Sequence, residues 1–167
     1  AIGSRALCGA LSGSDNNAIG QDALYSNWGG SGNVALGGST LRSNTTGCCN
    51  NAIGRNAMYK NTTGTHNNAL GNLALACNTT GYSNFAAGMS AMRKNWGGSE
   101  NVAIGSCALC SNTTGPYNYA IGYQALYSNT TGCNNNAIGM ENLRSNTTGY
   151  FNNAIGRRAL CKNTTGA

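Results

Sequence analysis

The chain has 167 residues, and only 8% of them are charged, against roughly 25% in ordinary soluble domains. Its net charge of +6 is a mild excess of ten cations over four acids, without the clustered basic runs of a nucleic-acid-binding arm, so we expect no nucleic-acid partner. No apolar run approaches the roughly 18 residues that cross a bilayer, and we expect no membrane insertion. With so little charge, the surface must present hydroxyl groups, amides or attached sugars.

One unit of seventeen residues repeats along the whole chain. When units are counted from Ala1, positions 3 and 13 are glycine in all ten units, and position 16 is asparagine in all nine units that reach it. The consensus is A-I-G-x-x-A-L-x-x-N-T-T-G-x-x-N-N. Strict periodicity without insertions is typical of a solenoid, in which each unit forms one coil against its neighbours. We therefore predict a single domain over residues 1–167, an all-β solenoid of ten coils.

Each position of the unit has an expected place in the coil. Positions 1, 2, 6 and 7 are predicted to face inward and to stack on their copies; in the first unit they are Ala1, Ile2, Ala6 and Leu7. Backbone hydrogen bonds along the axis would hold the coils about 4.8 Å apart. The glycines suit corners that need a positive φ or a close backbone approach. The asparagine of position 16 predicts a ladder of side-chain amides.

Two kinds of coil fit this unit. The stretch Ile53-Gly54-Arg55-Asn56-Ala57 fits the aliphatic-Gly-x-x-small pattern of left-handed β-helices, and a left-handed β-solenoid is the prediction. Positions 4 to 9 instead read out-out-in-in-out-out, which is closer to a helical period, so a strand plus a helical turn is the alternative. Regular helices need about 8–10 Å between axes and would splay a stack that strands hold at about 4.8 Å, which favours strands.

The tripeptide Asn-Thr-Thr at positions 10 to 12 has two interpretations. It is an acceptor for N-glycosylation in a secreted protein, and it occurs in seven units, at Asn44, Asn61, Asn78, Asn112, Asn129, Asn146 and Asn163. In two other units the asparagine is followed by Trp-Gly, as at Asn27 and Asn95, where no glycan could attach. This second observation favours a structural turn whose side chains bond the backbone. Sugars would supply solubility that the charges do not, and glycosylation is the prediction.

All ten cations occupy positions 4, 5, 8 or 9, so one face of the solenoid is predicted to be basic, with tyrosines at position 8 between them. The residues that define this basic and aromatic face are Arg42, Arg55, Tyr59, Lys60, Arg93, Lys94, Tyr127 and Arg144. One interpretation is a surface for an anionic polysaccharide or nucleic acid. The other, which we favour, is a solvated face on which the tyrosines stack for packing.

Patterns for catalysis or metal binding are sparse. The single histidine, His66, lies in a variable corner without a second histidine nearby. The four acids lie in four different units, at Asp15, Asp22, Glu100 and Glu141, and form no pair of the kind glycosidases use. Cys107-Ala108-Leu109-Cys110 is a CxxC motif without the second one that a zinc site needs. We therefore predict no enzyme activity, no metal and no cofactor.

Eight cysteines in a chain of this length indicate an oxidising compartment, unless they are small buried thiols at variable positions. No two cysteines are seventeen residues apart, which excludes stacked disulfides within the chain. Cys8 and Cys161 both occupy position 8, in the first and tenth units. If one chain stacks head to tail on another, these two lie about 4.8 Å apart, within the roughly 4.4–6.8 Å that a disulfide spans. We predict an inter-chain disulfide between them.

The unit AIGxxAL…NTTGxxNNAIG resembles tandem repeats of phage-type tail-fibre proteins. Its Asn-Asn-Ala-Ile-Gly core is similar to the head repeats of trimeric autotransporter adhesins, which form left-handed β-rolls. This resemblance implies an extracellular fibrous or adhesive role. The expected function is accordingly a structural subunit of an extracellular fibre, secreted, stacked on copies of itself and carrying covalent glycans.

Two alternative functions stay open. One is an adhesin-type repeat domain that binds glycans through the tyrosine and arginine face. The other is an ice-binding protein, because regular threonine rows on a flat solenoid can match an ice lattice. The adjacent threonines Thr45 and Thr46 disfavour ice binding, since both cannot face outward from a flat strand.

Overall fold

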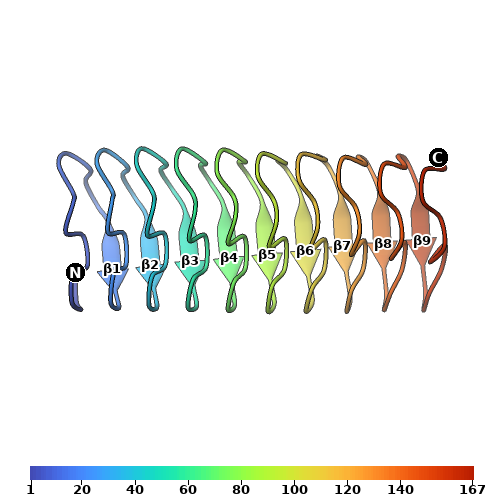
Figure 1. Cartoon of the computed structure of the whole chain (residues 1–167), viewed down its shortest axis with the longest axis horizontal. Coiled ribbons are helices and arrows are strands. Elements are labelled where there is room, and N and C mark those ends of the chain that lie inside the picture. Colours follow the sequence, from blue (N-terminus) through green and yellow to red (C-terminus); the bar gives the residue numbers. More distant parts are fainter.

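The computed structural model describes residues 1–167 as a stack of coils, with the two termini at opposite ends (Figure 1). Nine three-residue strands follow one another: β1 (Asn17–Ile19), β2 (Val34–Leu36), β3 (Asn51–Ile53), β4 (Asn68–Leu70), β5 (Phe85–Ala87), β6 (Val102–Ile104), β7 (Tyr119–Ile121), β8 (Asn136–Ile138) and β9 (Asn153–Ile155). They form one parallel sheet in chain order. The predicted β-solenoid is confirmed, and the alternative with a helical turn is wrong because the chain contains no helix.

The coils, numbered 1 to 10 from Ala1, close every seventeen residues. Ala18 of β1 lies opposite Ala35 of β2, and the same register continues through every pair to Ala137 and Ala154 in β8 and β9. Of 112 backbone–backbone hydrogen bonds, 96 lie outside the strands, for example from Leu41 N–H to the Ala57 carbonyl at 3.0 Å. Neighbouring coils are therefore held together around most of their perimeter, not along the sheet alone.

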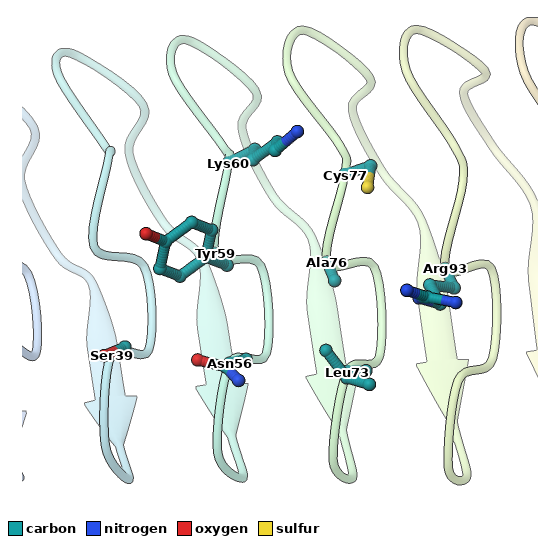
Figure 2. A pocket seen from close by; sticks show the side chains of 8 residues that line it. All are labelled: Ser39, Asn56, Tyr59, Lys60, Leu73, Ala76, Cys77 and Arg93. Atoms are coloured by element: carbon teal, nitrogen blue, oxygen red, sulfur yellow. The ribbon is translucent and has the colours of Figure 1, made fainter.

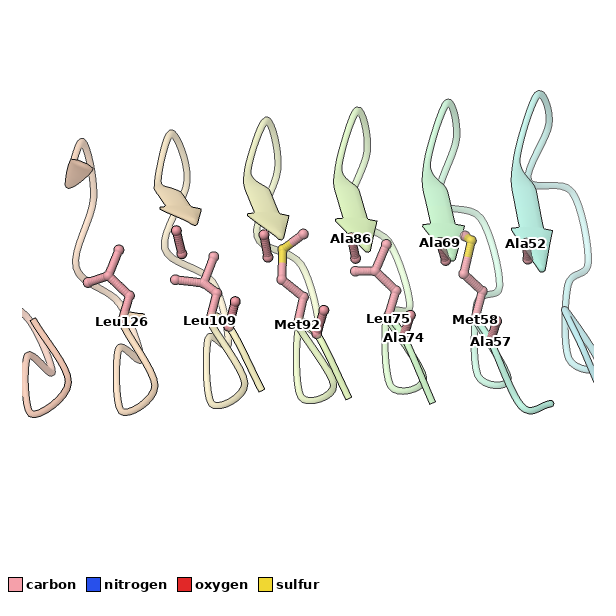
Figure 3. Close-up of a cluster of buried hydrophobic side chains, with 14 of the residues drawn as sticks. Ala52, Ala57, Met58, Ala69, Ala74, Leu75, Ala86, Met92, Leu109 and Leu126 are labelled. Atoms are coloured by element: carbon pink, nitrogen blue, oxygen red, sulfur yellow. The ribbon is translucent and has the colours of Figure 1, made fainter. Parts of the chain in front are cut away.

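The core consists of three axial rows of small and medium side chains (Figure 3). In coil 4 these are Ala52 at position 1, Ala57 at position 6 and Met58 at position 7, each with 0% exposure. In nearly all of the remaining coils, positions 1 and 6 are alanine and position 7 is leucine or methionine. Positions 1, 6 and 7 therefore face inward as predicted, and alanine in two of the three rows keeps the coil narrow.

The prediction that position 2 faces inward is wrong. Ile53 is 43% exposed, whereas the preceding Ala52 is fully buried. Successive side chains of a strand point to opposite faces, so an inward alanine forces the next residue outward. The isoleucines and leucines of position 2 consequently form an apolar row on the outer face of the sheet, where Ile19, Leu70 and Ile104 are 39–47% exposed.

Left-handed backbone conformations explain why positions 6 and 7 both point inward. Position 5, position 7 and position 15 have positive φ in every coil that contains them, as at Asn56 (φ 58°), Met58 (φ 50°) and His66 (φ 57°). A residue in this region breaks the strand alternation, so Ala57 and Met58 can be neighbours in sequence and both buried. The out-out-in-in-out-out pattern is therefore a turn with left-handed residues and not part of a helix.

The two invariant glycines are required for different reasons. Gly54 at position 3 has a φ of +127°, a conformation that L side chains rarely adopt. Gly64 at position 13 has no positive φ, but a Cβ there would lie 2.5 Å from the Gly81 carbonyl oxygen of the next coil. Both of the predicted reasons for corner glycines, a positive φ and a close backbone approach, are confirmed.

Candidate functional site

The asparagines of position 10 lie in the interior of the stack, not on its surface. Asn44 is fully buried, and its Nδ2 donates to Asn27 Oδ1 at 2.7 Å and to the Gly47 carbonyl at 2.9 Å. The same pair of bonds recurs in the following coils, so these side chains form an amide ladder along the axis. Asn27 belongs to this ladder although no threonine follows it, which explains why asparagine is present there.

The burial of these side chains disfavours the predicted N-glycosylation. A glycan would have to occupy the Nδ2 atom that makes these two internal hydrogen bonds. Six of the seven predicted acceptors have 0% exposure: Asn44, Asn61, Asn78, Asn112, Asn129 and Asn146. The seventh, Asn163, lies half-buried in coil 10 and donates to Asn146 Oδ1 at 3.2 Å.

The asparagines of position 16 form a second ladder, as predicted. Asn50 donates both its backbone N–H and its Nδ2 to Asn33 Oδ1 at 3.1 Å. Its Nδ2 also bonds the Gly64 carbonyl at 2.8 Å, the same oxygen that Asn61 bonds at 3.0 Å. The two ladders thus meet at the carbonyl of position 13, which accepts from the position 10 asparagine of its own coil and from the position 16 asparagine of the preceding coil.

The threonines of positions 11 and 12 have different environments. The Thr62 carbonyl accepts the N–H groups of Thr45 and Thr46 at 2.9 and 3.2 Å, and the Thr45 hydroxyl at 3.0 Å. Thr45 is half-buried by this contact, whereas Thr46 is exposed. In the interior coils only position 12 therefore presents threonine outward, as expected for two adjacent threonines that cannot both face outward.

Positions 5 and 8 form adjacent rows on the basic face, and in coils 1 to 3 their charges are paired. Arg5 Nε lies 2.7 Å from Asp22 Oδ1, and Arg42 Nε lies 4.0 Å from the other oxygen of that carboxylate. The Arg42 guanidinium also stands 5.1 Å from the Tyr25 ring centre and 5.8 Å from that of Tyr59. Stacking of arginine and tyrosine, a cation–π contact, therefore organises this end of the face.

Two cations of coils 9 and 10, Arg144 and Arg158, have partners as well. Arg158 Nε lies 2.5 Å from Glu141 Oε2, and its hydrogen bond lowers the pKa of that carboxyl below its ordinary value. Arg144 donates to Gln124 Oε1 at 3.0 Å, and its guanidinium lies 5.6 Å from the Tyr127 ring centre. These contacts support packing as the role of the predicted residues Tyr127 and Arg144.

The cations of coils 4 to 6 differ, because none of them forms an ion pair. Residues 23–99 contain no aspartate or glutamate. All three ion pairs of the structure involve Asp22 or Glu141. The predicted face cations of coils 4 to 6, which take part in none of these ion pairs, are Arg55, Lys60, Arg93 and Lys94.

A depression of about 460 Å³ opens on this unpaired part of the face (Figure 2). Its walls include Tyr59 and Lys60 from coil 4 and Arg93 from coil 6, and Ala76 of coil 5 lies between them. This depression was not predicted, although the sequence contains a signal for it. Ala76 is the only alanine at position 8, in a row otherwise made of tyrosine, arginine and cysteine.

All eight cysteines are free thiols, so the chain contains no internal disulfide. Cys8 is exposed in coil 1 and Cys161 is half-buried in coil 10, the first and last coils of the stack. Within the CxxC motif, burial raises the pKa of the Cys110 thiol, and the neighbouring Cys107 raises it further. The structure contains no group of three or more His, Cys, Asp or Glu side chains that could hold a metal ion.

His66 is exposed at its corner, with a φ of 57°, and residues of many other types adopt a similar φ at position 15.

No helix of the fold is long and apolar enough to cross a membrane. No protein-family model, curated protein or solved structure matches the chain. The basic depression over coils 3 to 6 is taken as the candidate site because it combines a concave surface with cations that form no ion pair.

Proposed function

We propose that this chain is a structural subunit of an extracellular fibre, in which copies stack head to tail. The observation that carries the proposal is a single coil-to-coil interface, repeated by translation with partners seventeen residues apart in every strand pair. An interface of this kind joins two different surfaces and does not close on itself, so it generates open filaments. Each coil therefore supplies both halves of the contact that a filament needs.

The hydrogen-bond pattern supports a mechanical role. Backbone hydrogen bonds and the two asparagine ladders link each interior coil to the next one. Extending such a rod requires many of these bonds to break together at one coil interface. Every coil would therefore contribute equally to the strength of a uniform shaft.

The extracellular part of the proposal has separate support. It rests on the low charge of the chain, with 8% charged residues, and on the resemblance of the unit to tail-fibre and adhesin repeats. Because the eight cysteines form no disulfide within the chain, they do not strengthen it further.

Electron microscopy of the full chain over a range of concentrations tests the assembly. A single chain of ten coils at about 4.8 Å should be a rod about 48 Å long. We expect filaments that lengthen with concentration, with light scattering rising in parallel. Rods of one chain length at every concentration would contradict head-to-tail stacking.

A disulfide between Cys8 and Cys161 of successive chains is a finer part of the same proposal. Both residues occupy position 8, so stacking of coil 1 on coil 10 brings them to one coil spacing. On a non-reducing gel after mild oxidation we expect a ladder of covalent multimers that Cys8→Ser reduces to monomers. Cys133→Ser, which removes a half-buried thiol at position 14, is the matched control and should leave the ladder unchanged. Filaments without a ladder would eliminate the disulfide but not the stacking.

A further inference from the structure

The depression over coils 3 to 6 exists because one large side chain is replaced by a small one. Position 8 is Arg42, Tyr59, Ala76 and Arg93 in four successive coils. The Tyr59 ring leans toward Ser39 and away from Ala76, as Figure 2 shows, and Lys60 extends toward the coil of Cys77. The space that a fifth-coil tyrosine or arginine would fill is therefore open, with Ala76 and Leu73 as its floor.

Charge distinguishes this depression from the rest of the basic face. Residues 23–99 carry five cations, Arg42, Arg55, Lys60, Arg93 and Lys94, and no acid, which gives a formal charge of +5. Arg42 shares the carboxylate of Asp22 at the coil 2 side, but Lys60 and Arg93 have no ion-pair partner. A concave surface with uncompensated charge of one sign raises the local concentration of anions.

We propose that this depression binds an acidic saccharide, with a sugar ring over Ala76 and its carboxylate or sulfate group held by Lys60 and Arg93. Arginine and lysine form charge-assisted hydrogen bonds with such oxyanions, roughly twice as strong as neutral ones. Asn56 and Ser39 line the same depression and supply an amide and a hydroxyl for sugar hydroxyls. The Tyr59 ring supplies an apolar surface beside them. This inference goes beyond the structural role and does not depend on filament assembly.

The same residues fit single-stranded nucleic acid less well. Binding of that kind uses several aromatic rings on which successive bases stack, together with cations that follow the backbone. Tyr59 is the one aromatic residue of the depression, and the Arg42 guanidinium already lies 5.8 Å from its ring centre. A small depression with cations on two sides fits a saccharide with one acidic sugar between neutral sugars better than it fits a nucleic-acid strand.

Calorimetric titration of the full chain, below the concentration at which filaments form, tests the proposal. The probes are hexasaccharides of polygalacturonate, of a sulfated glycosaminoglycan and of cellulose, and a short oligo-dT. We expect binding of at least one of the two acidic sugars, and comparison of these two identifies carboxylate or sulfate as the preferred group. The neutral sugar should bind at least about tenfold more weakly than the preferred acidic one.

Three variants locate the binding. Ala76→Tyr fills the depression with the residue that coils 2, 4 and 8 have at this position, without changing charge, and should abolish binding while the circular dichroism spectrum is retained. The double variant Lys60→Gln/Arg93→Gln should lose at least about a hundredfold in affinity, about tenfold for each charge. Arg157→Gln removes an exposed cation of coil 10 and should leave the affinity within about twofold.

Three results would overturn the proposal. The first is no binding of either acidic sugar. The second is an affinity that survives Ala76→Tyr, or that Arg157→Gln reduces as much as the double variant does, since either outcome means attraction to the basic face as a whole. The third is tighter binding of oligo-dT than of both acidic sugars, which would identify a nucleic-acid surface instead. Filament assembly plays no part in any of these results, so their outcome is separate from that of the fibre proposal.

Discussion

The side-chain amide of Asn61 donates a hydrogen bond to Asn44 Oδ1 at 2.8 Å and, in turn, accepts one from Asn78 Nδ2 at 2.7 Å. All three residues have 0% exposure, and each is separated from the next by one coil. Asn61 also donates to the Gly64 carbonyl of its own turn at 3.0 Å. One side chain thus satisfies three buried polar groups besides its own, and it connects three coils.

Removal of one rung of this ladder should be costly. Asn61→Ala leaves the buried Asn44 Oδ1 without a partner, at about 1–3 kcal/mol, and removes one of the two hydrogen bonds of Asn78 Nδ2 and of the Gly64 carbonyl, at about 1 kcal/mol each. We expect the free energy of unfolding to fall by about 3–5 kcal/mol, measured as a shift in the urea midpoint. Asn72→Ser is the control, since Asn72 is exposed at position 4 and serine occupies that position in coils 1 and 7. A loss for Asn61→Ala no larger than that of the control would contradict the ladder as a source of stability.

The same burial predicts that the folded protein carries no N-linked glycan at the Asn-Thr-Thr sites. Expression through the secretory pathway of a eukaryotic cell gives the glycosylation machinery access to all seven sites. After endoglycosidase treatment, mass spectrometry of the folded fraction should find unmodified asparagine at Asn44, Asn61 and their copies. Conversion to aspartate at an interior site of folded material would mean that the amide ladder is not as described.

Much of this fold follows from periodicity alone. Seventeen-residue spacing fixes the coil length, and an invariant asparagine or glycine at one position can be satisfied only by its copies above and below. The coil period, the ladder of Asn33 and Asn50, and the inward rows of Ala52 and Met58 were all predictable for this reason. A row in a solenoid contacts the same row, so the contacts need no knowledge of distant parts of the chain.

The outward direction of position 2 and the depression required more than periodicity. Ile53 was expected inside because it is apolar, but alternation along β3 places it outside once Ala52 is inside. Three left-handed positions in each coil decide which neighbours share a face, and residues as different as Asn56, Leu73 and Cys107 adopt that conformation at position 5. Residue type therefore gave no signal for these turns. The depression depends on which side chain is missing from a row, as at Ala76, and becomes visible only when the rows are compared.

Two apolar truncations distinguish the observed placement from the one expected from hydrophobicity. Leu75 has 0% exposure in the core row, so Leu75→Ala should cost about 2–5 kcal/mol through lost burial and the cavity that remains. Ile53 is 43% exposed, so Ile53→Ala should cost about 1 kcal/mol or less. Chemical denaturation of both variants, with the same buffer and protein concentration, measures the difference. If Ile53→Ala lowers the free energy of unfolding as much as Leu75→Ala does, position 2 is buried and the placement described here is wrong.

A pair of glycines separates the effect of close packing from the general effect of glycine. At Gly64 a Cβ would lie 2.5 Å from the Gly81 carbonyl oxygen and 2.7 Å from Asn78 Nδ2, and both neighbours are fixed by the ladder. Gly64→Ala must therefore push coils 4 and 5 apart, and we expect the free energy of unfolding to fall by about 3 kcal/mol or more, as for other overpacked interiors.

At Gly38 no atom lies within 4 Å of the added Cβ, and φ is not positive. Gly38→Ala should be neutral or should stabilise the chain by about 0.5 kcal/mol, because alanine restricts the unfolded chain more than glycine does. Urea midpoints of the two variants against the parent provide the measurement. Equal losses in both would show that glycine is needed for backbone freedom throughout the coil, whereas opposite signs would locate the requirement in the contact between position 13 and the next coil.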